Sequence, residues 1–428
     1  MVVKHKIEVR ELNNGLRLLL IDVKGAVTFK LEVINRGGYR IAKSDQFELP
    51  HLLEHLAFDG NQQYPEKEKY MFEIEKRGVY QNATTSTNLI KYYYDGVCSE
   101  TEDIIDLALA QYCQPLFRQI DIDNEKEVID NELSRYLEDD NYRAGYLNLQ
   151  LSSPFKWPEL KTRVGQMRQI SREDILAYYH KTHTSANTMI ILAGDLSVVD
   201  LDSKIDQIGK AFENAGLTGG SLLSLEQAYG SSQDQAIVNH LKSVRQQQAN
   251  FELDYLLRDY SLDDRYPMNF FNIIYNGGFA SRLFEKARSA GLSYGPSSSY
   301  SQTLDYASFT LSDETIAVKL PDLYQLMILE LDRLLNGDIN KYEFARAKGF
   351  ILGSLQRSFQ LPEDLARFYR DDFVYGREFQ SPDQVINIYR DFDIDSILAT
   401  AKRYIQPANS ILTVVDSHKD LGTVFTKL

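Results

Sequence analysis

The sequence predicts an α+β fold in which one unit of helices and strands occurs twice. Segments with apolar residues at every second position, such as 27–33, alternate with segments that carry them at three- and four-residue steps, such as 103–117. Residues 173–194 also align without a gap to 395–416, and both segments predict a helix, a short polar turn ending in Ala-Asn and a buried strand. The alternative is chance, because helix-turn-strand segments are common, but we favour a duplication.

The individual elements follow from the same two periods. Residues 16–23 form an apolar run after three turn residues, and with 27–33 they are expected to form a hairpin whose second strand buries one face. Further helices are expected at 48–58, 66–77, 103–117 and 124–137, and further strands at 88–97 and 188–192.

The middle of the chain carries the best candidate for a linker. Residues 215–235 are rich in Gly and Ser and lose the helical period. We therefore expect a first domain at 1–215, a linker at 216–235 and a second domain at 236–428.

Composition excludes several classes of protein. The 428 residues carry a formal net charge of −14, which argues against binding to a nucleic-acid backbone. The two cysteines, Cys98 and Cys113, are too few for a disulfide framework, and no window is apolar enough to span a bilayer. The polar segment 1–10 resembles no signal or transit peptide. We expect a cytoplasmic protein, complete as printed.

A histidine pair on a predicted helix is the strongest chemical signal. His51 and His55 are four residues apart, so their rings share one helix face with Cβ atoms about 5–6 Å apart, a spacing that suits two ligands of one Zn²⁺. Glu54 borders that face and could take a proton from a metal-bound water. The alternative is an ordinary helix with polar residues on its exposed side.

A catalytic zinc ion needs three protein ligands and one open position, so a third ligand is expected from another element. The predicted helix 124–137 offers Glu125, Glu127 and Glu132, and Glu138 follows it. Glu125 and Glu132 are two helical turns apart and share a face, whereas Glu127 lies off it. The pattern therefore points to this face without choosing between its two carboxylates.

Taken together, these motifs resemble the insulinase, or pitrilysin, family of HxxEH zinc metallopeptidases, and among them the half-length type to which the mitochondrial processing peptidase subunits belong. HLLEH is followed after 76 residues by Glu132 within EKEVIDNE. Residues 78–96 (GVYQNATTSTNLIKYYYDG) and 277–294 (GGFASRLFEKARSAGLSY) are similar to further family segments. The resemblance implies two homologous α/β-sandwich-like domains, each a mostly antiparallel sheet packed with helices.

Roles for site residues come from this resemblance. It implies that His51, His55 and Glu132 bind one zinc ion per chain, that Glu54 is the general base and that Glu125 orients a metal ligand without binding the ion itself.

The resemblance also assigns residues to the substrate. The strand around Asn82, Ala83 and Thr84 would bind an extended peptide as an added strand. Arg288 and Tyr294, from a second domain that lacks the metal motif, would contact the peptide and support the oxyanion.

The chain departs from the family in two places. The family's Arg and Tyr are usually one residue further apart, so Arg282 competes with Arg288. Glu48-Leu49-Pro50 stands where the family usually has a Gly, which is expected to alter how the helix begins without changing the metal ligands. His180 and His183 lack a carboxylate pattern and are expected to be surface or C-cap residues.

The function expected from these features is a zinc-dependent endopeptidase that cleaves peptides or small unfolded polypeptides. Long family members enclose substrate with four such domains and this chain has two, so we expect a chamber formed by a homodimer or by a heterodimer with a related subunit. One alternative is a maturation peptidase that removes a leader from one dedicated substrate. Another is a non-catalytic peptide-binding subunit, although none of the motif residues is missing.

Overall fold

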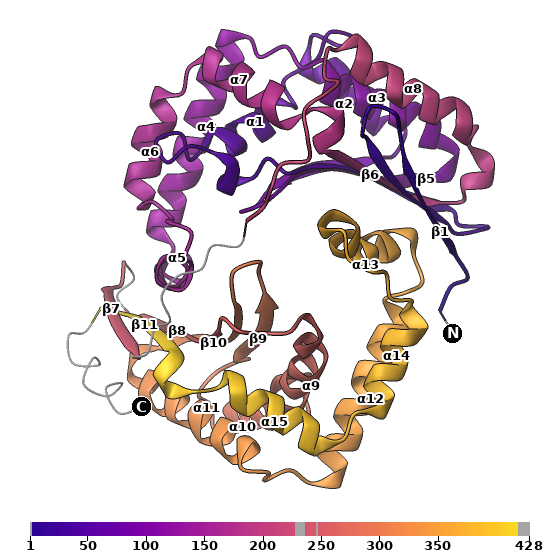
Figure 1. Ribbon diagram of the computed structural model, residues 1–428. Helices are drawn as coiled ribbons and strands as arrows, with labels where there is room; N and C mark the ends of the chain where they lie inside the picture. The colour runs from indigo at the N-terminus through magenta and orange to yellow at the C-terminus, as the bar shows by residue number, and fades with distance from the viewer. Residues whose placement is uncertain (1, 227–235, 245–246, 418–428) are drawn as a thin grey trace. The chain divides into compact units, whose positions relative to one another are not determined.

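The computed structural model of this protein describes residues 2–226, 236–244 and 247–417. It divides into two compact units (Figure 1). Unit 1 comprises Met1–Leu133, Pro158–Glu226 and Arg357–Gln380, and unit 2 comprises Ser134–Trp157, Gln227–Gln356 and Ser381–Leu428. Each unit contains one mostly antiparallel sheet packed with helices, which confirms the predicted fold class.

The sheet of unit 1 has six strands in the order β1-β2-β6-β3-β5-β4. Its neighbours pair antiparallel except β2 and β6, which pair in parallel. The strands are β1 (Lys6–Glu11), β2 (Arg17–Asp22), β3 (Thr28–Asn35), β4 (Tyr80–Thr85), β5 (Ile90–Val97) and β6 (Thr188–Gly194).

Helices cover this sheet with their apolar residues. Helix α3 packs against β3 and β5, and helix α13, which comes from far along the chain, packs against β2, β3 and β6. The described helices of unit 1 are α1 (Leu49–Leu56), α2 (Lys67–Glu75), α3 (Thr101–Cys113), most of α4 (Gln119–Glu138), α6 (Leu160–Gln169), α7 (Arg172–Thr182), α8 (Leu201–Asn214) and α13 (Pro362–Tyr375).

The sheet of unit 2 has five strands in the order β7-β11-β8-β10-β9, with one parallel pair, β7 and β11. This order repeats the five strands β2-β6-β3-β5-β4 of unit 1. Helix α7 with β6, and helix α15 with β11, are the two segments that align in the sequence, so the predicted duplication is confirmed. The strands are β7 (Ile237–Lys242), β8 (Gln248–Leu257), β9 (Ser297–Gln302), β10 (Ala307–Ile316) and β11 (Ser410–Asp416).

Helices pack on this second sheet in a similar way. Helix α5 lies against β8 and β11, and α9 lies against β9. The described helices of unit 2 are α5 (Asp140–Ser152), α9 (Arg265–Asn276), α10 (Arg282–Ser289), α11 (Leu320–Leu335), α12 (Lys341–Arg357), α14 (Pro382–Asp391) and α15 (Ile394–Tyr404). No helix within the described ranges has the length and apolar character needed to cross a membrane.

The two units exchange helices along the chain. Helix α5 precedes the predicted linker yet belongs to unit 2, and α13 follows the linker yet belongs to unit 1. Residues 216–226 remain with unit 1, where the Leu223 amide donates to Asn187 Oδ1 at 3.0 Å. The rest of the predicted linker, 227–235, lies outside the described residues. The division of the chain into homologous domains at 1–215 and 236–428 stays a prediction.

The expected hairpin of 16–23 and 27–33 is wrong. Both segments are strands, but β6 pairs with each of them and lies between β2 and β3. The antiparallel partner of β2 is β1, a charged and exposed edge strand that the apolar pattern did not reveal. Periodicity identifies a strand and its faces, whereas its neighbours are set by contacts between distant segments.

The expectation that 27–33 buries one face is also wrong, because β3 buries both. Lys30 is 7% exposed and Glu32 is fully buried. Lys30 donates to Asp95 at 2.8 Å, and Arg370 of α13 donates to Glu32 through Nε at 2.6 Å. Ion pairs with distant residues therefore allow charged side chains where the sequence alone indicates solvent.

His180 is exposed and His183 is the C-cap of α7, so the expectation that the two are surface or C-cap residues is confirmed. His183 is also buried in the core of unit 1, which the sequence did not indicate. The Nε2 atom of His183 lies 3.2 Å from the Tyr92 hydroxyl, and its Nδ1 atom lies 2.9 Å from Thr182 Oγ1. Complete burial lowers the pKa of His183 to about 3.

We expect His183 to make unit 1 sensitive to acid. Below its ordinary pKa of about 6.5 the unfolded chain binds a proton that the native ring does not, so stability falls as the pH falls from about 6.5 towards 3. In metal-free protein, His183→Gln should reduce the loss of unfolding free energy between pH 7 and pH 5 by about 2 kcal/mol, measured by urea denaturation. His240→Gln, at an exposed site, is the control, and equal pH dependence in the two variants would contradict the assignment.

Candidate metal centre

Helix α1 presents two histidines beside the core of unit 1. Pro50 lies in its first turn, where a missing N–H costs nothing, and the leucines of α1 are buried. Burial of this apolar face fixes the helix and leaves His51 and His55 together, with side chains 13% and 21% exposed and ring centroids 4.8 Å apart.

Helix α4 brings a carboxylate to both rings. Glu132 Oε2 lies 3.8 Å from His51 Nε2 and 3.9 Å from His55 Nε2. One donor atom from each of these three residues lies within 4.8 Å of the others, and the described residues contain no other such group of three. Two imidazoles and one carboxylate are a donor set typical of catalytic zinc sites, so the residues present fit Zn²⁺.

The Nδ1 atom of each ring, on the side of the imidazole away from Glu132, faces a further carboxylate. His55 Nδ1 lies 2.8 Å from Glu125 Oε2, and His51 Nδ1 lies 3.2 Å from Glu48 Oε2. The shared face of Glu125 and Glu132 follows from their spacing in the sequence. The contact of Glu48 was missed, although a carboxylate three residues before the first His at a helix start is a signal for it.

Each of these carboxylates is also held by a cation. Arg163 Nε donates to Glu48, and Lys67 Nζ lies 3.5 Å from Glu125. Burial acts to raise the pKa of Glu48, but hydrogen bonds from His51 and Arg163 outweigh it and the pKa is lowered. In the same way, His55 and Lys67 outweigh burial and lower the pKa of Glu125. Both carboxylates are therefore charged acceptors at neutral pH.

Glu54 lies beside the cluster and is half-buried. Burial raises its pKa above the ordinary value, while a hydrogen bond from Thr85 Oγ1 opposes the rise. A raised carboxylate pKa suits proton transfer near neutral pH. Thr85 is a second contact that sequence analysis missed, although it follows directly after the assigned residues Asn82, Ala83 and Thr84.

Strand β4 carries those three residues at the edge of the sheet. Among the described strands β4 pairs only with β5, and α1 packs against it. Asn82 and Thr84 are exposed while Ala83 is buried, and Asn82 Oδ1 accepts from the Ala83 amide at 2.8 Å. An edge strand next to Glu54 can accept an extended peptide as a further strand.

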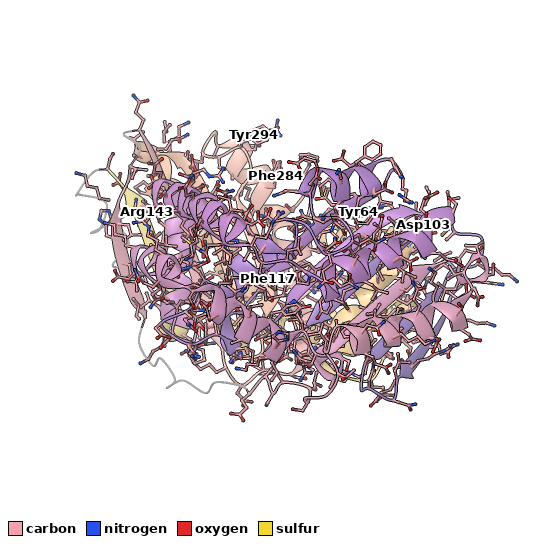
Figure 2. All side chains as sticks on the ribbon, turned by 90° about the horizontal axis from the view of Figure 1, so that it is seen from above. Tyr64, Asp103, Phe117, Arg143, Phe284 and Tyr294 are labelled. Atoms are coloured by element: carbon pink, nitrogen blue, oxygen red, sulfur yellow. The ribbon has the colours of Figure 1, made fainter. Side chains whose placement is uncertain are left out.

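Arg288 and Tyr294 belong to unit 2. Tyr294 is 82% exposed (Figure 2). The Arg288 guanidinium lies 5.1 Å from the centroid of the Tyr294 ring. The two exposed side chains thus form one local pair. Their contact with a substrate stays a prediction.

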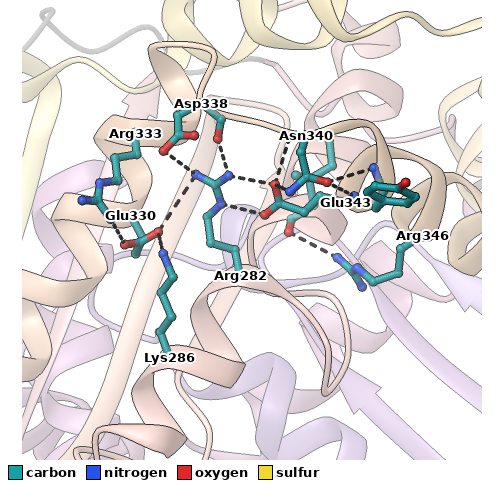
Figure 3. A network of polar contacts seen from close by, with 10 residues as sticks. Arg282, Lys286, Glu330, Arg333, Asp338, Asn340, Glu343 and Arg346 are labelled. Atoms are coloured by element: carbon teal, nitrogen blue, oxygen red, sulfur yellow. Dashed lines mark hydrogen bonds and ion pairs between the residues drawn. The ribbon is translucent and has the colours of Figure 1, made fainter.

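The competing candidate, Arg282, is committed to a network within unit 2 (Figure 3). Its side chain is 5% exposed, and it donates to both oxygens of Glu343 at 3.0 Å. It also donates to the Asp338 carbonyl. Because these partners hold the Arg282 guanidinium in the protein interior, the geometry favours Arg288 as the arginine available to a ligand.

Comparisons with known proteins identify the family to which this chain is similar. The family "Insulinase (Peptidase family M16)" matches residues 28–156, and "Peptidase M16 inactive domain" matches residues 169–349. A protein described as an uncharacterized zinc protease from Rickettsia felis is 25% identical over 410 residues, which are 94% of this chain and 95% of that protein.

Solved structures show the same fold over nearly the whole chain. A protease from Helicobacter pylori has a TM-score of 0.83 at 17% identity and covers 96% of this chain and 100% of its own. A peptidase M16 inactive domain from Pseudomonas fluorescens has a TM-score of 0.84 at 16% identity, with 96% and 98% covered. The chain belongs to the insulinase family of peptidases (M16) and is of its half-length, two-domain type.

Proposed function

We propose that this protein is a zinc-dependent endopeptidase that hydrolyses peptides or small unfolded polypeptides. The observation that carries the proposal is the convergence of His51 Nε2, His55 Nε2 and Glu132 Oε2 beside the half-buried Glu54. The zinc-protease description of the Rickettsia relatives supports the choice of metal.

The chain's own residues can perform the proton transfers of peptide hydrolysis. His51, His55 and Glu132 would hold one Zn²⁺, which when bound supplies a Lewis acid that polarises the carbonyl and lowers the pKa of water. Glu54 accepts the proton of the attacking water and delivers it to the leaving amine, and Thr85 holds the Glu54 carboxylate in place.

Strand β4 is the proposed binding site for the substrate main chain. A peptide added at this edge gains main-chain hydrogen bonds, which carry no sequence preference, while the exposed Asn82 and Thr84 contribute side-chain contacts. We further propose that Arg288 and Tyr294 contact the peptide and the developing oxyanion. Such binding requires an extended segment, so folded proteins are poor substrates.

We also propose a cytoplasmic location, with which the free and buried Cys98 and Cys113 are compatible.

We further propose that two half-length chains pair to form a chamber, either as a homodimer or with a related subunit. For a homodimer, the solution mass of the purified protein should equal that of two chains, and a monomer that is fully active would contradict the chamber.

Metal removal is expected to abolish peptide cleavage. Dialysis of the purified protein against a chelator should eliminate hydrolysis of a fluorogenic peptide, and about one equivalent of Zn²⁺ per chain should restore it, because each proposed site holds one ion. Metal analysis should find no bound zinc in His55→Ala. Undiminished cleavage after metal has been removed would contradict the proposed function.

A further inference from the structure

Glu48 contacts a proposed metal ligand without being one itself. We propose that Glu48, held by Arg163, is a positioning residue that fixes the His51 ring with Nε2 towards the metal. The inference rests on the proposed zinc centre and deepens it.

The contacts of Glu48 divide its two oxygens between two partners. Oε2 lies 3.2 Å from His51 Nδ1, and Oε1 accepts from Arg163 Nε. Glu48 is fully buried and Arg163 is 3% exposed. The Arg163 guanidinium carbon lies 5.2 Å from the Phe47 ring centroid and 5.7 Å from that of Tyr39, and these two rings stack on each other. The Glu48 carboxylate therefore has little freedom to turn away from His51.

This arrangement selects one tautomer of the imidazole. A carboxylate paired with a guanidinium offers only acceptors, so the hydrogen of His51 lies on Nδ1 and the lone pair lies on Nε2. Nε2 is the atom that faces Glu132 at 3.8 Å. His55 repeats the pattern with Glu125 and Lys67, so both rings are oriented by carboxylates that are themselves held by cations.

Stability alone is a weak explanation for the Glu48 and Arg163 pair. Desolvation of two buried charges offsets much of their attraction, and apolar replacements of such pairs are often neutral or stabilising. Carboxylates that accept from a ligating histidine, by contrast, commonly strengthen metal binding about 10–100-fold. The position of Glu48 behind a proposed ligand is what an orienting role requires.

Zinc affinity of the Glu48→Gln variant tests the proposal without an activity assay. The Gln oxygen pairs with Arg163, so the amide N–H₂ faces His51 Nδ1 and favours the tautomer with hydrogen on Nε2, which opposes coordination. We expect the zinc dissociation constant, measured by competition with a chromophoric chelator, to rise about 10–100-fold. The visible spectrum of the Co²⁺-loaded variant should also change.

A second substitution separates orientation from a loss of structure. In Glu48→Gln/Arg163→Met the Gln oxygen is released from Arg163 and can accept from His51, while Met retains apolar packing against Phe47 and Tyr39. We expect this double variant to bind zinc more tightly than Glu48→Gln. A purely structural role predicts the opposite, because the double variant has lost one more native contact.

The controls distinguish failure of this inference from failure of the zinc centre. Glu127→Gln, at an exposed position of α4, should bind zinc like the wild type, and His55→Ala should not bind it. Wild-type affinity in Glu48→Gln, with His55→Ala defective, would overturn the inference alone. Wild-type affinity in His55→Ala would overturn the proposed centre. If Glu48→Gln fails to fold, Glu48→Leu/Arg163→Met takes its place, with the same expected 10–100-fold weakening and the same deciding outcome.

Discussion

Glu54→Gln is expected to reduce the turnover number for peptide hydrolysis by about 10²–10⁴-fold, the usual contribution of a general base. Gln has the size of Glu and can still accept the Thr85 hydrogen bond, but it cannot take a proton from water. The zinc content should stay at the wild-type level, because Glu54 is not part of the three-residue cluster. Steady-state kinetics on a fluorogenic peptide and metal analysis of the same sample provide the measurement.

Glu127→Gln is the matched control for this experiment. It removes a carboxylate from the exposed face of α4 and should leave both turnover and zinc content unchanged. Cleavage by Glu54→Gln at the wild-type rate would discredit the assigned base. Loss of zinc together with loss of activity would instead assign Glu54 to metal binding.

The centre could be predicted from the sequence to the extent that helix geometry determines it. Four residues separate His51 from His55 and seven separate Glu125 from Glu132, so each pair shares a helix face whatever the rest of the fold does. The structure brings these two faces together. The pairing of helices 70 residues apart came from the resemblance, since spacing alone supplies no such contact.

The contacts that hold the cluster could not be predicted in the same way. Arg163 lies 115 residues beyond Glu48 in a segment without any motif, and the two meet only because the fold brings α6 to the start of α1. The departure from the family at Glu48 was interpreted as a change in how the helix begins. The structure shows that this side chain contacts His51, because residue i and residue i+3 share a helix face.

The same limit applies to the sheets. The alternation of apolar and polar residues predicted strand β3. The ion-pair partner of Glu32 lies 338 residues away on α13, so the sequence pattern alone placed Glu32 on a solvent-exposed face. The exchange of α5 and α13 between the units has no signature in local periodicity. The helix-turn-strand repeat, in contrast, was predictable because both copies keep their own local pattern.

The exchanged helices are attached by different chemistry. Arg370 of α13 makes two hydrogen bonds to the buried Glu32, one of them at 2.6 Å. On α5, the neutral Asn148 donates to Asp254 Oδ2 at 3.0 Å. Burial and the neighbouring Asp254 carboxylate raise the pKa of Glu252 to about 8. The contacts of α13 therefore include a buried ion pair, whereas those of α5 include a neutral amide beside a carboxyl group whose pKa is raised.

Arg370→Met is accordingly expected to destabilise unit 1 by about 3–5 kcal/mol, because it leaves the carboxylate of Glu32 buried without its partner. Urea denaturation should show the loss, and hydrogen exchange should rise first in α13. Glu32→Leu/Arg370→Met removes both charges and should recover most of the stability. Arg367→Met, on the same helix with its side chain 66% exposed, should change stability by less than about 0.5 kcal/mol. Equal unfolding midpoints for Arg370→Met and Arg367→Met would show that packing on β2, β3 and β6, and not the ion pair, holds α13 in place.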